Sequence, residues 1–67
     1  PTLNDISEGD AGIIGELFLA AKQIAADLKI DETGYRTVIN CNADGGQEVF
    51  HLHLHLLGGR KMAWPPG

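Results

Sequence analysis

The chain has 67 residues, with five lysines and arginines against nine aspartates and glutamates, and a formal net charge of −4. A chain of this length forms one domain at most and buries only roughly 60% of its unfolded surface, so its core is small. The acidic balance argues against non-specific nucleic-acid binding, which requires a basic face. The single cysteine, Cys41, excludes an internal disulfide. We expect a cytoplasmic protein without a signal peptide or a membrane span.

A helix is predicted over about residues 7–29, after an extended segment at residues 1–6. Ser7 is a favoured N-cap, and Asp10 places a carboxylate in the first turn. Apolar residues then recur at helical spacing. The resulting stripe consists of Ile14, Leu17, Phe18, Ala21, Ile24 and Leu28. This pattern indicates one amphipathic helix packed on a sheet.

Two strands are predicted after the helix, over about residues 35–41 and 48–57. Both segments are rich in β-branched, aromatic or alternating apolar residues. The turn-forming cluster at residues 42–46 separates them, so the strands are expected to pair antiparallel. Residues 58–67 are predicted to be a tail, because Pro65 and Pro66 can continue neither a helix nor a central strand. The predicted fold class is α+β in a single domain over residues 1–67.

Three histidines alternate with apolar residues in the second predicted strand. Successive side chains of a strand point to opposite faces, so His51, His53 and His55 share one face. Phe50, Leu52, Leu54 and Leu56 share the other face, which can pack under the helix. The histidines must therefore line a surface or a pocket.

This row of imidazoles has three interpretations. The histidines can be solvated bystanders, although strict alternation makes that interpretation weak. They can be zinc ligands, but the outer two are too far apart to reach one ion easily. They can catalyse phosphoryl or nucleotidyl transfer, in which one neutral imidazole is the nucleophile and a neighbour donates a proton. In that case the turn at residues 45–47 would supply phosphate donors just before the strand.

The histidine row resembles the signature of the histidine triad (HIT) superfamily, His-apolar-His-apolar-His-apolar-apolar. The sequence is also similar to the histidine triad nucleotide-binding (Hint) branch at several further points. These are residues 25–28, 34–36, Asn40, residues 44–47, residues 58–60, Met62 and residues 64–67. The combination of the triad with Gly-Gly-Gln and Trp-Pro-Pro-Gly is more specific than the triad alone.

The resemblance implies a role for each matching residue. His53 would be the nucleophile that takes a nucleotidyl group through its α-phosphorus, and the backbone carbonyl of His51 would orient its ring. His55 would contact the phosphate or the leaving group. The implied catalytic set is thus His51, His53 and His55. The implied nucleotide- and phosphate-binding set is Asn40, Gly46, Gln47, Glu48, Val49, His53 and His55.

The resemblance also implies substrates and partners. Substrates would be purine nucleoside 5′-phosphoramidates or aminoacyl adenylates, with no metal or other cofactor. The protein would be a homodimer in which Trp64 contacts the site of the partner subunit. Glu48 stands where some relatives carry serine, and Ala63 where some carry histidine, so substrate preference is expected to differ.

A complete domain of this family is nearly twice this length. The chain therefore looks like its C-terminal half, and a chain that supplies the N-terminal half is an expected partner. Two further hypotheses stay open: a non-catalytic nucleotide-binding or interaction module, and a structural zinc-binding fragment.

Overall fold

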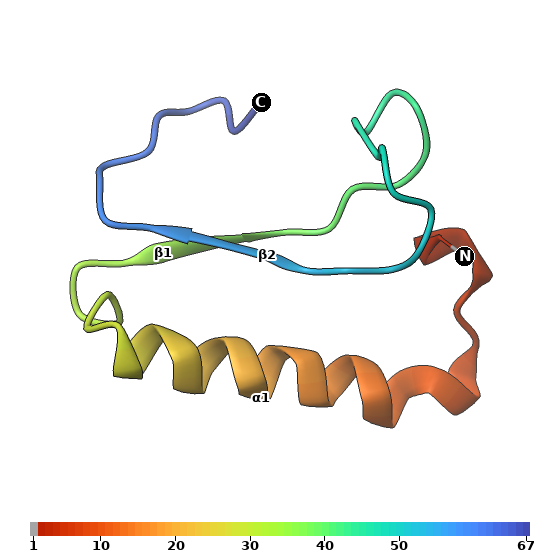
Figure 1. Cartoon of the computed structure of the whole chain (residues 1–67), viewed down its shortest axis with the longest axis horizontal. Coiled ribbons are helices and arrows are strands. Elements are labelled where there is room, and N and C mark those ends of the chain that lie inside the picture. The colour runs from red at the N-terminus through yellow and green to blue at the C-terminus, as the bar shows by residue number, and fades with distance from the viewer. Residues whose placement is uncertain (1) are drawn as a thin grey trace.

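The computed structural model describes residues 2–67 as one long helix lying along a two-stranded antiparallel sheet (Figure 1). The helix forms one layer and the hairpin the other. The C-terminal tail lies on the side of the sheet away from the helix. The predicted α+β class is confirmed. Within the described part of the chain, no helix combines the length and apolar character needed to span a bilayer.

The chain opens with a short 3-10 helix, η1 (Leu3–Asp5), where an extended segment was predicted. The Thr2 N–H donates to the Asp5 carboxylate at 2.7 Å, and the Asn4 N–H donates to the Thr2 hydroxyl at 3.2 Å. These local bonds satisfy backbone donors without any distant contact. The extended prediction is therefore wrong for Leu3–Asp5, and its first residue, Pro1, lies outside the described residues.

The main helix, α1 (Ala11–Asp27), follows a second 3-10 turn, η2 (Glu8–Asp10). Ser7 precedes this turn. Its N–H donates to Oδ2 of Asp10 at 2.9 Å, and its hydroxyl donates to the same oxygen at 3.3 Å. The helical region thus begins after Ser7, and its first turn is wound more tightly than an α-helix.

The helix ends at Asp27, two residues before the predicted end. Lys29 adopts a left-handed conformation with φ 61°. The Ile30 N–H donates to the Ala25 carbonyl at 3.0 Å, and the Lys29 N–H to the Ala26 carbonyl at 3.1 Å. This pair of bonds is the Schellman arrangement, which usually has glycine at the left-handed position. Because that residue is lysine here, the stop carries no sequence signal.

The sheet consists of β1 (Tyr35–Val38) and β2 (His55–Gly58). Their antiparallel register runs from Tyr35↔Gly58 to Val38↔His55. The strands are much shorter than predicted, so the strand predictions are wrong for residues 39–41 and 48–54. Beyond the last pair the two segments separate (Figure 1), and the loop bonds to itself instead. Alternation in sequence does not create a strand without a neighbouring backbone to pair with.

The register decides which side chains face the helix. A Cβ built on Gly58 would lie 2.5 Å from Cδ1 of Ile30, so the face of Gly58 and Leu56 is the helix side. Earlier in the same segment, Leu52 lines a cavity together with Ile14 of α1. His55 lies on the opposite face, as the alternation predicted.

The buried core is small. Only two apolar side chains are buried among the described residues, Ala25 at 0% and Ala21 at 4% exposure. Ile14 and Leu17 are half-buried on the same helix face. Phe18, Ile24 and Leu28 belong to the predicted stripe but are exposed. A two-stranded sheet is too narrow to cover a full apolar helix face, so only the central line of the stripe is buried.

Candidate active site

The three histidine rings lie side by side in the segment that enters β2. The ring centroids of His51 and His53 are 5.6 Å apart, and those of His53 and His55 are 4.7 Å apart with an edge-on geometry. Only His55 belongs to a strand. His53 is half-buried between two exposed neighbours. The predicted row of imidazoles on one side of the chain is therefore present.

A hydrogen bond fixes the ring of His53. Its Nδ1 lies 2.9 Å from the backbone carbonyl oxygen of His51. A carbonyl oxygen only accepts hydrogen bonds, so Nδ1 must carry the proton. In the neutral ring the lone pair then belongs to Nε2, which points away from this contact. The carbonyl contact expected for His51 is thus observed, and it leaves the Nε2 lone pair of the neutral ring free of this contact.

A cavity of about 180 Å³ adjoins His53 and His55. It is lined by Asn40, Gly46, Gln47, Glu48, Val49, His53 and His55. These are the seven residues predicted to bind the nucleotide and its phosphate. Their individual roles stay predictions. His51 lies outside this lining and touches the site through its carbonyl and its ring.

Gln47 holds the loop that forms one wall of the cavity. It is the only buried polar side chain in the described residues, with 5% exposure. Its Oε1 accepts from the Asn42 N–H at 2.8 Å, and its Nε2 donates to the Val49 carbonyl at 3.0 Å. The side-chain amide expected to bind phosphate thus also ties both ends of the loop together. One Nε2 hydrogen is left over for a ligand.

The turn before the triad has fewer free backbone N–H groups than expected. The Gly46 N–H donates to the Ala43 carbonyl at 2.9 Å, and the Gln47 N–H donates to the Asn42 carbonyl at 3.0 Å. These two groups close the turn and are not free for phosphate. The prediction that they would be phosphate donors is wrong, because a tight turn uses its own N–H groups.

Gly45 is required for this turn by close packing. A Cβ at this position would lie 2.6 Å from the backbone oxygen of Cys41 and 2.8 Å from its nitrogen. Cys41 is half-buried and its thiol is free, but its backbone is what the loop packs against. In the sequence, the pair Gly45 and Gly46 predicts a turn but does not reveal this close contact.

The C-terminal tail is attached to β1 by a residue that the sequence analysis did not select. Nη2 of Arg36 donates to the Ala63 carbonyl at 3.1 Å, 27 positions along the chain. Trp64 follows directly and is 83% exposed. Arg36 and His55 lie on the same face of the sheet by the register. The tail therefore runs over the histidine face, and Trp64 projects from it.

The zinc interpretation can be compared with the arrangement of possible ligands in the described residues. Among residues 2–67, no group of three or more His, Cys, Asp or Glu side chains is arranged to hold a metal ion. The zinc interpretation has no geometric support in this part of the chain. The expected lack of a cofactor stays a prediction.

Comparison with known proteins assigns the family. The HIT domain model matches residues 1–62. An uncharacterized HIT-like protein of Synechocystis is 52% identical over the whole chain, which covers 58% of that protein. A crystal structure of a HIT family hydrolase from Legionella pneumophila superposes with a TM-score of 0.97 at 50% identity. That match covers 98% of this chain and 59% of the hydrolase. A histidine triad protein from Clostridium difficile gives a TM-score of 0.87 at 40% identity, over 92% of this chain and 54% of that one.

The chain belongs to the HIT domain family, which includes hydrolases. It spans a little over half the length of the relatives that it matches. The family assignment made from the histidine row is confirmed.

Proposed function

We propose that the chain carries the phosphate-binding side of a nucleotidyl-transfer site of the Hint type. The substrate would be a purine nucleoside 5′-phosphoramidate or an aminoacyl adenylate. His53 would act as the nucleophile, and the product would be the nucleoside monophosphate. One observation supports this most directly: the 2.9 Å contact between Nδ1 of His53 and the His51 carbonyl, which leaves Nε2 as the nucleophilic nitrogen beside the cavity.

The proposed reaction has two steps, transfer of the nucleotidyl group to His53 and its hydrolysis by water. In the first, the Nε2 lone pair of His53 forms a bond to the α-phosphorus, and the bond from phosphorus to the leaving group breaks. The leaving nitrogen takes up a proton, which would come from His55, whose ring lies 4.7 Å from that of His53. In the second, water attacks the same phosphorus and the P–Nε2 bond breaks. The proton lost by water returns to the histidine pair.

Glu48 supports a preference between the two substrate classes. Its side chain lines the same cavity as His53 and His55. A carboxylate there repels a departing carboxylate and attracts a departing amine that becomes protonated. We therefore favour phosphoramidates over acyl adenylates. Phosphate would be held by the Val49 N–H, Asn40 and the remaining Gln47 amide hydrogen.

The partners follow from the same proposal. Residues outside this chain would complete the nucleoside side of the site, in a homodimer whose Trp64 reaches the partner's site. The 83% exposure of Trp64 and the small buried core support a further covering surface. The cytoplasmic location stays a prediction.

The direct test is hydrolysis of adenosine 5′-phosphoramidate, with His53→Ala and His51→Ala compared side by side. His53→Ala removes the nucleophile and should lower turnover roughly 10³-fold or more, whereas His51→Ala keeps the carbonyl and should cost less than about tenfold. Equal losses would refute the assigned roles. Nucleotide binding by folded protein without turnover would favour the alternative, a non-catalytic binding module.

A further inference from the structure

Four of the five lysines and arginines of this acidic protein line two cavities at one end of the molecule. Two adjoining cavities, of about 240 Å³ and about 480 Å³, share Thr33, Gly34, Arg60 and Lys61. Arg36 lines the first and Lys29 the second. We call these two cavities the basic groove. It holds four of the five lysines and arginines, so the rest of the chain carries one cation against nine acids.

No acid belongs to the groove. Neither cavity has an aspartate or glutamate among the described residues that line it. Asp31 and Glu32 lie in the preceding turn but outside both linings. The wall of the groove therefore carries cations and no carboxylate, although the protein as a whole is acidic.

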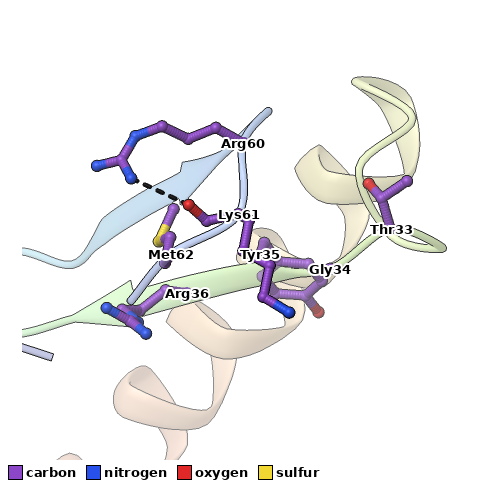
Figure 2. A pocket seen from close by; sticks show the side chains of 7 residues that line it. All are labelled: Thr33, Gly34, Tyr35, Arg36, Arg60, Lys61 and Met62. Carbon is purple, nitrogen blue, oxygen red and sulfur yellow. Dashed lines mark hydrogen bonds between the residues drawn. The ribbon is translucent and has the colours of Figure 1, made fainter. Parts of the chain in front are cut away.

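Backbone contacts hold two of the cations in place. Nη1 of Arg60 donates to the Lys61 carbonyl at 3.2 Å (Figure 2), and Arg36 donates to the Ala63 carbonyl. Each guanidinium keeps further N–H donors for a ligand, because arginine carries five. Figure 2 shows Arg36 on β1, Arg60 and Lys61 on the segment after β2, and Thr33 on the loop that leads from the helix to β1. The donors thus come from three separate segments of the chain.

Two glycines that line the groove, Gly34 and Gly59, leave their backbone uncovered by other side chains. A Cβ built on Gly34 or Gly59 would meet nothing within 4 Å. Both glycines have positive φ, 113° and 93°, so larger residues are disfavoured there. An anion can therefore approach the backbone between the flanking basic side chains.

We propose that the basic groove binds a compact polyphosphate anion, separately from the histidine cavity. Each cavity is lined by three of these cations, which suits a ligand with several negative charges better than a single phosphate. The groove lies at the Tyr35↔Gly58 end of the hairpin, whereas the triad enters at the Val38↔His55 end. This site goes beyond the nucleotidyl-transfer function and does not depend on it.

Titration calorimetry with inorganic tripolyphosphate, in the presence of a chelator, tests the proposal. We expect saturable binding that weakens as salt is added, and much weaker binding of orthophosphate. The double variant Arg60→Ala, Lys61→Ala should weaken binding by about tenfold or more, because two charge-assisted contacts are lost. Lys22→Ala, at the one cation outside the groove, is the matched control and should bind as the unaltered protein does.

Two further measurements locate the ligand. Amide resonances of Gly34 and Gly59 should shift on binding while that of Gly46 does not. The charge-preserving variant Lys61→Arg should retain binding, which separates a lost charge from a lost fold. The proposal is overturned by absent or non-saturable binding, by equal binding of orthophosphate, or by shifts centred on Gly46. An equal loss in Lys22→Ala also overturns it. His53→Ala should abolish hydrolysis and leave this binding unchanged, so the two proposals can fail separately.

Discussion

The triad end of the hairpin and the helix are held by different forces. At the triad end, hydrogen bonds between residues close in sequence fix the loop and the His53 ring. At the helix, a narrow line of apolar contacts centres on two alanines, and several large apolar side chains stay exposed. The candidate site is thus organised by local polar contacts. The packing of the helix, in contrast, depends on an apolar face that is mostly exposed.

The largest change in the free energy of unfolding should come from removing the Gln47 side chain, which links the two ends of the loop. Gln47→Ala leaves the Asn42 N–H and the Val49 carbonyl without their partner. We expect the free energy of unfolding to fall by about 2–3 kcal/mol. Urea denaturation measures this change. The control is Gln23→Ala, which removes an exposed bond to Asp27 and should cost less than about 0.5 kcal/mol. Similar losses in both variants would contradict the role of Gln47.

The substitution Gly45→Ala should cause the next largest loss of stability. The added Cβ would lie 2.6 Å from the Cys41 carbonyl oxygen, so the turn must shift. We expect a loss of about 2 kcal/mol in thermal or urea unfolding. Gly12→Ala is the matched control, because its Cβ meets nothing within 4 Å. Gly12 is the second residue of α1, in its first turn, so that change should stabilise the protein by about 0.5 kcal/mol or less. Effects of the same sign would refute the packing argument.

A smaller gain is expected at the end of α1. Lys29 has φ 61°, which glycine adopts without a steric penalty. Lys29→Gly should therefore raise the free energy of unfolding by about 0.5–1 kcal/mol. The same substitution at Lys22, inside the helix, should lower it by a similar amount. A loss at Lys29 would mean that its side chain matters more than its backbone conformation.

The smallest effect should be a pH dependence at the N-terminus. The Thr2 backbone N–H, which donates to the Asp5 carboxylate, lowers the pKa of Asp5 below its ordinary value of 3.8. A lowered pKa in the folded state stabilises the protein above the unfolded pKa, and this contribution is lost as the pH falls through the folded pKa. Asp5→Asn should therefore lower the melting temperature slightly at neutral pH. The difference should disappear in strong acid, and a difference independent of pH would contradict this explanation.

The sequence allowed the local features of the site to be predicted well. Alternation placed the three imidazoles together, and the resemblance to the HIT family named the residues that line one cavity. These features depend on residues near one another along the chain or across the hairpin. The Ser7 helix start is local in the same way.

Features that depend on backbone geometry or distant contacts could not be predicted. Lys29 ends the helix in a conformation that its residue type does not favour. The extent of the strands depends on where the two backbones separate, and the side-chain alternation does not encode that point. The contact between Arg36 and Ala63 joins residues 27 positions apart, and no local pattern marks it.

The central claim is that His53 becomes covalently nucleotidylated through Nε2. Rapid acid-free quenching during turnover of adenosine 5′-phosphoramidate, followed by peptide mass spectrometry, tests this claim most directly. We predict an adenylyl group on His53 alone, absent in His53→Ala and retained in His51→Ala. Turnover with the adenylyl group on His51 or His55, or with none on any histidine under conditions that trap the intermediate, would contradict the account.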